Sequence, residues 1–110
     1  MKKDEVIVAL SALAQSTRLD ILRFLVSKGP EGAAAGAIAA HIGTPASTLT
    51  FHVKTLTEAG LLVRRRAGRQ LIYRVDFGAL HAIIAYLLEN CCAESGQPVP
   101  ELVSIADDVA

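Results

Sequence analysis

Two helix patterns separated by a glycine-threonine-proline turn constrain the fold of this chain more than any other feature. The first pattern, Ile38 to Ile42, is short and apolar and ends at Gly43. Thr44-Pro45 then predicts a new helix, because Thr can supply a cap oxygen and Pro at the first helical position loses an N–H that had no partner. In that second helix, residues 47–58, one buried stripe is expected from Leu49, Val53 and Leu56. A short helix, a tight turn and a second helix with polar outward positions form a helix-turn-helix.

Apolar residues at helical spacing predict two further helices before this motif. The first covers about residues 3–15. The second is expected to take Ser16-Thr17 as its N-cap and to stop at Gly29-Pro30. Residues 31–36 then read as a loop that leads into the helix-turn-helix.

A β-hairpin and a long helix are predicted after the motif. The extended runs Leu61 to Arg66 and Gln70 to Val75 are joined by Ala67-Gly68-Arg69, and a three-residue connection that contains Gly indicates a hairpin. Each arm is short, so the hairpin is a wing rather than a larger sheet. Asp76 is expected to cap a last, strongly apolar helix that runs from Phe77 to Cys92.

Length and composition predict one domain, residues 1–96, followed by a flexible acidic tail, residues 97–110. A chain of 110 residues is usually one domain, and the run of Ser, Gly and Pro that starts at Ser95 interrupts regular structure. The elements predict a mainly α fold with a small β-wing, that is, a winged helix-turn-helix. With 52% hydrophobic residues and no Trp, the chain is rich in apolar side chains for its length, which suggests a homo-oligomer.

The formal net charge is zero, but the charges are segregated along the chain. Residues 47–75 carry six basic side chains and one acidic one, whereas residues 76–110 carry six acidic side chains and no Lys or Arg. A basic middle segment within a neutral total suggests an anionic partner at that segment.

The first residues show only a faint likeness to a secretory signal. Asp4 and Glu5 interrupt the basic start, and the apolar run that follows is short. No stretch approaches the ~18 apolar residues of a membrane span. We therefore expect a cytoplasmic protein with reduced thiols and no membrane partner.

The outward side of helix 47–58 is expected to lie in the major groove of double-stranded DNA. The residues of this helix that face away from the core are Ser47, Thr48, Thr50, Phe51 and Lys54. Hydroxyls at the helix start can meet phosphates or base edges, and Phe51 can touch a thymine methyl group. His52 falls near the buried side, so it is expected to be a structural histidine rather than a base reader.

The wing adds the DNA-binding candidates Arg64, Arg66 and Arg69. Alternate side chains of a strand face opposite ways, so Arg64 and Arg66 share a face that Arg65 does not. Arg69, at the turn, is best placed to reach a phosphate or the minor groove. The alternative is a solvated basic hairpin on an ordinary helical domain, and the preceding helix-turn-helix argues against it.

Several segments resemble the ArsR/SmtB family of winged-helix repressors. Ala14 to Leu22 is similar to the family's "L-A-x-x-T-R-L-x-I-L" opening, Ser47 to Val53 to its recognition helix, and Gly68 to Val75 to its wing. The resemblance covers about residues 5–92. It implies a regulator rather than an enzyme, a homodimer joined by the first and last helices, and a partly palindromic operator that is released when an inducer binds.

The family resemblance also implies where an inducer can bind. A Cys-Val-Cys-like arsenic site is absent, because that segment reads Ala34 to Ala37 here. The positions similar to a zinc-type site are Asp76, Glu89 and Cys92, a set too broken for the full tetrahedron that zinc requires. A further arsenic-type site uses adjacent cysteines at the end of the last helix, and Cys91-Cys92 match that placement.

Cys91 and Cys92 are the only cysteines of the chain. Adjacent thiols form a strained crosslink, but they chelate a soft ion well. The family site often has a third cysteine, which this chain lacks. Inorganic trivalent arsenic takes three sulfurs when it can, whereas a monosubstituted arsenical such as methylarsenite needs two. The expected inducer is a trivalent arsenical, arsenite or methylarsenite, with antimonite as a further candidate and no resident cofactor.

Other readings of the cysteine pair stay open. The chain can be a regulator of the same family without a metal inducer, controlled by thiol redox or by a protein partner. Strain in a ring between neighbouring cysteines argues against redox control. A thiol enzyme or a metal store is disfavoured, because no base lies near the cysteines in sequence and two ligands store little metal.

Overall fold

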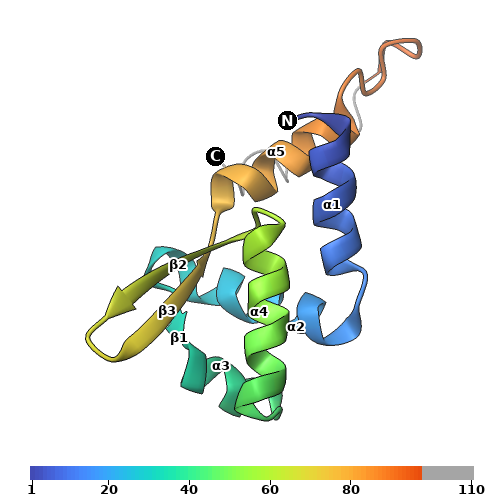
Figure 1. Cartoon of the computed structure of the whole chain (residues 1–110). Helices are drawn as coiled ribbons and strands as arrows, with labels where there is room; N and C mark the ends of the chain where they lie inside the picture. Colours follow the sequence, from blue (N-terminus) through green and yellow to red (C-terminus); the bar gives the residue numbers. More distant parts are fainter. Residues whose placement is uncertain (98–110) are drawn as a thin grey trace.

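The computed structural model describes residues 1–97, and within them the chain folds into a winged helix-turn-helix (Figure 1). The mainly α fold with a small β-wing is therefore confirmed. The predicted tail, residues 97–110, lies outside the described part except for Gln97. In chain order the elements are α1 (Lys3–Leu13), α2 (Ser16–Lys28), the 3-10 turn η1 (Gly29–Glu31), β1 (Ala33–Ala34), α3 (Ala35–Ile42), α4 (Ala46–Glu58), β2 (Leu62–Ala67), β3 (Gln70–Val75) and α5 (Phe77–Leu88).

The core lies where α2, α3 and α4 meet and where the base of the wing joins them. The predicted stripe of α4 is buried, since Leu49, Val53 and Leu56 are each at most 1% exposed. Burial of one such side chain stabilises the fold by about 1.5–3 kcal/mol. The other large side chains that are fully buried are Ile21, Leu25, Ile38, Leu61 and Val75. The core therefore fixes which side of α4 faces outward.

The wing is the outer part of a three-stranded antiparallel sheet with strand order β1-β3-β2. Ala67 pairs with Gln70, so the hairpin turn has two residues, Gly68 and Arg69, and the predicted three-residue connection was wrong. The prediction of a loop over 31–36 was also wrong, because Ala33 and Ala34 pair with β3. Two alanines carry no alternation of apolar and polar residues, so this strand could not be predicted from the sequence pattern.

Two of the predicted helix starts were wrong by one residue. The N-cap of α2 is Gln15 rather than Ser16-Thr17. The Gln15 side chain accepts a hydrogen bond from the Arg18 backbone N–H at 2.8 Å. The N-cap of α4 is Pro45, and Thr44 makes no side-chain cap. The first helix, α1, ends at Leu13, within two residues of the predicted end.

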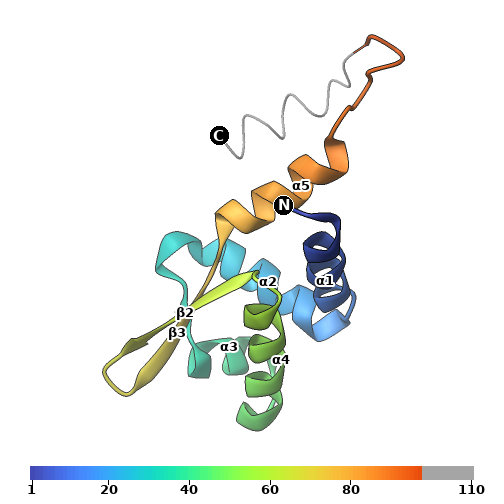
Figure 2. The same cartoon turned by 45° about the horizontal axis from the view of Figure 1, so that its top comes forward.

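The cap of the last helix was predicted correctly, but its end was not. Asp76 Oδ1 accepts a hydrogen bond from the Ala79 backbone N–H at 3.0 Å. The helix ends at Leu88 instead of Cys92, because Glu89 takes an extended conformation (φ −54°, ψ 134°) and Asn90 has a φ of 63°. Figures 1 and 2 show that residues 89–97, the described part of the chain after α5, project away from the body.

We predict that Gly32→Ala destabilises the fold more than Gly29→Ala. Both glycines have positive φ, +68° and +65°, so each alanine is strained by about 1–2 kcal/mol. A Cβ on Gly32 would also clash with the backbone carbonyl of Tyr73 in β3, whereas a Cβ on Gly29 meets nothing within 4 Å. Urea unfolding should give Gly32→Ala an additional loss of about 1–3 kcal/mol. Equal losses for the two variants would contradict this close approach of the chain to β3.

Candidate DNA interface and thiol pair

The outward side of α4 is a polar, exposed surface. All five residues predicted there are exposed: Ser47, Thr48, Thr50, Phe51 and Lys54. Phe51 is unusual among them, because a large aromatic ring that is 61% exposed has no packing role in the monomer. The Thr50 hydroxyl donates a hydrogen bond to the Ala46 carbonyl at 2.9 Å, so it keeps its acceptor capacity for an outside donor.

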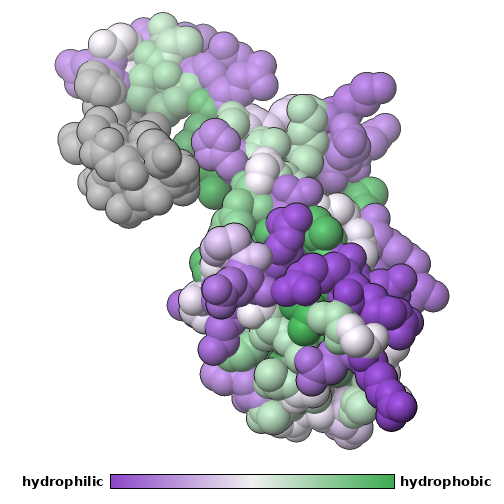
Figure 3. Space-filling view, turned by 90° about the vertical axis from the view of Figure 1, so that its left-hand side faces the viewer, coloured by the Kyte–Doolittle hydropathy of each residue, from purple (hydrophilic) through white to green (hydrophobic). Residues whose placement is uncertain are grey.

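The wing carries the strongest concentration of positive charge. Arg64, Arg65, Arg66 and Arg69 are all exposed, so the strand alternation buries none of them. Viewed from the wing side, strongly hydrophilic side chains cluster over this part of the molecule (Figure 3). The register pairs Arg64 with Tyr73 and Arg66 with Leu71, two positions apart on one face, while Arg65 pairs with Ile72 on the other.

The structure brings the wing and α4 together in one groove. This groove has a volume of about 660 Å³ and is lined by Thr50 and Lys54 of α4 and by Arg64 of β2, among others. Its floor is apolar and includes Val53, Leu62 and Leu71. Three of the predicted DNA-binding residues, two from α4 and one from β2, therefore border a common hollow. Its lining carries two positive charges, those of Lys54 and Arg64, and one negative charge, that of Glu58.

His52 is buried, as predicted, at 8% exposed. Arg18 Nη1, at the start of α2, donates to His52 Nδ1 at 3.3 Å. Burial, and then the positive charge of Arg18, lower the pKa of His52 below its ordinary value of 6.5. Arg18 could not be predicted from the sequence as a partner of His52, because Arg18 and His52 are 34 positions apart and only the fold brings them together.

The two cysteines lie in a turn that follows α5. Cys91 is exposed and Cys92 is half-buried, and their Sγ atoms are 3.2 Å apart. Cys92 has a φ of 63°, which lies in the left-handed region. The hydrogen bond with Cys92, followed by burial and by the charge of Cys92, raises the pKa of the Cys91 thiol. Among residues 1–97, no group of three or more His, Cys, Asp or Glu side chains is arranged to hold a metal ion.

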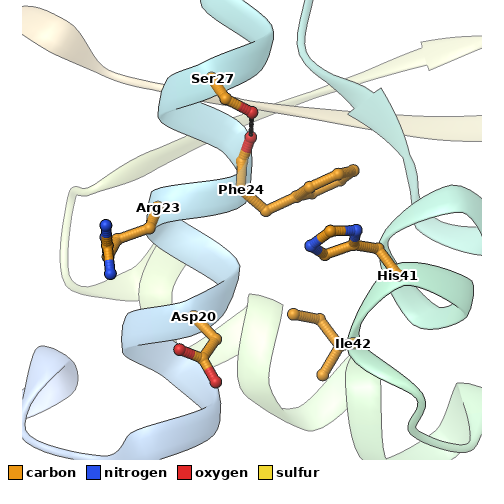
Figure 4. Close-up of a pocket in the computed structure, with 6 residues that line it drawn as sticks. All are labelled: Asp20, Arg23, Phe24, Ser27, His41 and Ile42. Carbon is orange, nitrogen blue, oxygen red and sulfur yellow. Dashed lines mark hydrogen bonds between the residues drawn. The ribbon is translucent and has the colours of Figure 1, made fainter.

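A further hollow of about 420 Å³ lies between α2 and α3 (Figure 4). Phe24 and His41 stack across it with ring centroids 4.1 Å apart. Asp20 and Arg23 also line this hollow, but their charged ends point away from the His41 ring (Figure 4). The polar groups do not converge on one point, so this stack is a packing contact between two helices rather than a binding site.

No helix in the described part of the chain is long and apolar enough to cross a membrane.

Comparisons with known proteins agree with the geometry. A family model described as a helix-turn-helix domain matches residues 13–65. The chain is 31% identical over 83 residues to the HTH-type transcriptional regulator YgaV of Escherichia coli strain K12, covering 76% of this chain and 82% of that protein.

Solved structures of regulators have the same fold. One is the homodimeric winged helix-turn-helix DNA-binding domain of Mb0332 from Mycobacterium bovis, described as a possible ArsR-family transcriptional regulator. It is 31% identical, with a TM-score of 0.63 over 80% of this chain and 82% of that one. Another is described as a possible transcriptional regulator for arsenical resistance. It is 29% identical, with a TM-score of 0.64 over 91% of this chain and 94% of that one. The chain therefore belongs to the ArsR family of winged helix-turn-helix, DNA-binding transcriptional regulators.

Proposed function

We propose that this regulator is a cytoplasmic, dimeric repressor that leaves its operator when a trivalent arsenical binds Cys91 and Cys92. The observation that carries the proposal is the pair of free sulfurs, 3.2 Å apart, in the turn directly after α5. Its support from relatives is the 29% identical structure described as a possible transcriptional regulator for arsenical resistance.

The spacing of the sulfurs suits a pyramidal ion better than a tetrahedral one. With bonds of about 2.3 Å, the usual zinc–thiolate length, sulfurs 3.2 Å apart subtend an angle of about 90° at the bound atom. A tetrahedral ion with the same bonds needs sulfurs about 3.8 Å apart. Trivalent arsenic carries a lone pair and is pyramidal, so the pair fits it without a change in the sulfur–sulfur distance.

The proton balance also favours an arsenical over zinc. The hydrogen bond with Cys92 raises the pKa of the Cys91 thiol, which makes the loss of its proton harder. Zinc binds thiolates, so a thiol that binds zinc must release its proton to solution. Methylarsenite carries two hydroxides instead. Two S–As bonds form, two As–OH bonds break, and the thiol protons leave with the hydroxides as two waters.

The number of thiols at the site, two, equals the number of sulfur donors that methylarsenite requires. Methylarsenite keeps its As–C bond, so two sulfurs complete its coordination. Arsenite bound by the same pair needs a third donor, and no third ligand group is arranged at the cysteines within residues 1–97. We therefore expect methylarsenite to bind more tightly than arsenite or antimonite.

A second copy of the chain is the partner that best fits the exposed apolar side chains of α1 and α5. Ile7 and Val8 of α1 are 50% and 52% exposed, and Leu87 of α5 is 58% exposed. Exposed apolar residues on neighbouring helices indicate an interface. The Mycobacterium bovis relative is homodimeric. Sedimentation equilibrium should give a dimer, and a stable monomer would contradict this part of the proposal.

Release of the repressor from its operator is explained by the position of Cys91 and Cys92 next to the proposed dimer contact. Leu87 and Leu88 belong to the proposed dimer face, and Cys91 and Cys92 lie three and four residues after Leu88. A ligand that locks the turn changes how α5 ends and hence how the two copies pack. Two recognition helices must match half-sites about 34–36 Å apart, so a small change at the dimer contact weakens binding. The expected coupling is about 1–3 kcal/mol. Because the pair lies beyond the end of α5 at Leu88, chelation does not require unwinding of the helix.

On the DNA, α4 and the wing have separate roles. The residues of α4 proposed to enter the major groove are Ser47, Thr48, Thr50, Phe51 and Lys54. Arg64 and Lys54, at the edges of one groove, are placed for the phosphate backbone between α4 and the wing. Arg66 and Arg69 extend the positive surface toward the wing tip, where Arg69 reaches a phosphate or the minor groove.

We predict that Arg69→Gln weakens operator binding mainly by loss of one phosphate contact in each subunit of the proposed dimer. The slope of log K against log salt should become less steep by about 1.8, which is about 0.9 for each contact. Arg23→Gln, which removes an exposed arginine from α2, is the matched control and should leave the slope unchanged. Fluorescence anisotropy with labelled operator at several salt concentrations measures both. Equal slopes for Arg69→Gln and the parent would show that the wing tip does not contact DNA.

We predict that Cys91→Ser and Cys92→Ser keep full operator affinity but no longer leave the operator when methylarsenite is added. Each serine removes one of the two sulfurs and leaves the fold intact, since neither cysteine belongs to the core. The measurement is an operator-release titration with methylarsenite, arsenite, antimonite and zinc. The parent should respond to methylarsenite at the lowest concentration and should not respond to zinc.

The same titration separates the alternatives. Release of either serine variant as readily as the parent would disprove the arsenical site. Release of the parent by zinc alone would overturn the ligand assignment. Release by peroxide with no response to arsenicals would instead favour redox control of the pair, and no response to any of them would favour control by a protein partner.

A further inference from the structure

Arg18 joins three elements through one guanidinium group. Its Nε donates to the Ala12 carbonyl, in the last turn of α1, at 2.6 Å, and its Nη1 donates to His52 Nδ1 of α4 at 3.3 Å. Its own backbone N–H is bound by Gln15, the N-cap of α2. The turn between α1 and α2 lies beside α4 in both ribbon views (Figures 1 and 2).

His52 also contacts Phe51, a residue of the surface proposed to bind DNA. The rings of His52 and Phe51 meet edge to face, with centroids 5.5 Å apart and an interplanar angle of 68°. His52 is buried and fixed, while Phe51 is 61% exposed. An exposed phenylalanine has two rotatable side-chain bonds and little else to hold it, so the His52 ring restricts where the Phe51 ring lies.

We infer that Arg18 is a positioning residue for DNA reading, which ties the end of α1 to the recognition helix through His52 and fixes the direction of Phe51. The inference rests on the proposed DNA contact of Phe51 and the proposed dimer role of α1. It does not depend on the arsenical site. It also gives a physical connection between the proposed dimer helix and the surface that reads DNA.

Lysine cannot take the place of arginine here. The guanidinium donates from two nitrogens in fixed directions, to a carbonyl of α1 and to a ring nitrogen of α4 at once. A lysine ammonium is one point charge and reaches one of them. His52 Nδ1 accepts a hydrogen bond only when the ring is neutral with its proton on Nε2, because Arg18 has donors alone.

The contact therefore depends on pH. Burial and the Arg18 charge lower the pKa of His52 below 6.5, so the ring is neutral at pH 7. The charged group beside it is Arg18 from α2. Glu58, farther along α4, lines a hollow with Arg18, and from α1 this hollow is lined by Ile7, Val8, Ser11 and Ala12, which do not titrate. From α3 the titratable His41 stacks on Phe24 instead. Because the folded pKa is depressed, the contact is present above pH 6.5 and is lost as the pH falls through the folded value.

The test compares Arg18→Gln and Arg18→Lys with Arg23→Gln, the control on the same helix. The measured quantities are affinity for operator DNA, affinity for non-specific DNA and the melting temperature, all without inducer. We expect Arg18→Gln to weaken operator binding about tenfold or more, and Arg18→Lys to weaken it by slightly less. Non-specific affinity, which depends on phosphate contacts, should change less than threefold, so the specificity ratio falls.

A second pair of variants separates positioning from simple folding. His52→Asn places an amide oxygen near the Nδ1 position but removes the ring that meets Phe51. It should keep the tie to Arg18 and lose the restraint on Phe51, so its operator affinity should lie between those of the parent and Arg18→Gln. His52→Leu should lose as much as Arg18→Gln. The double variant Arg18→Gln, His52→Leu should be no worse than either single one. Operator affinity of the parent should fall below pH 6.5, and that of His52→Asn should not.

Several results would overturn the inference. One is an Arg18→Gln variant that binds operator as the parent does. A second is equal loss of operator and non-specific affinity, which would indicate damage to the fold alone. A third is a parent and a His52→Asn variant with the same pH profile. Each of these results can be interpreted even if the arsenical proposal fails, because the measurements use no inducer.

Discussion

The burial of one side of α4 is the constraint on which the rest of the structure depends. Leu49, Val53 and Leu56 enter a core formed with α2 and α3, and they do so almost completely. A helix with one side fixed in this way has no freedom to turn, so its opposite side must face solvent. Side chains with hydroxyls, one lysine and an exposed phenylalanine thereby form a fixed, exposed surface, which is the one proposed to contact DNA.

The wing extends that surface because its register places positive charge beside α4. Arg64 borders the same groove as Lys54, and the turn at Gly68 carries Arg69 outward. The distribution of charge along the chain agrees with this surface, because the middle segment is basic and the C-terminal part is acidic. Net charge alone would not have suggested a DNA-binding protein. The folded surface explains why a chain with a total charge of zero binds an anionic partner.

Features set by local sequence were predictable. The helix-turn-helix, the hairpin and the Asp76 cap each depend on residues a few positions apart, and periodicity and capping rules describe such features well. The buried His52 also followed from its place beside the apolar stripe of α4.

Features set by distant contacts were not predictable. Strand β1 exists because Ala33 and Ala34 meet β3, some 40 residues later in the chain. The partnership of Arg18 with His52 depends on the same kind of long-range contact. The end of α5 at Leu88 was missed because apolar spacing continues to Cys91 in the sequence, while in the structure residues 89–97 project away from the body.

The thiol pair gains its significance from this end of α5. It lies on a turn beyond the helix, with sulfurs already close together and no third ligand arranged beside them within residues 1–97. We propose that one trivalent arsenic atom binds both sulfurs and nothing else from the protein. Arsenic K-edge X-ray absorption of the protein loaded with methylarsenite would show this binding, because it counts the neighbours of arsenic. We expect two sulfurs and one carbon, and oxygen in place of either sulfur would mean that one of the cysteines does not bind arsenic.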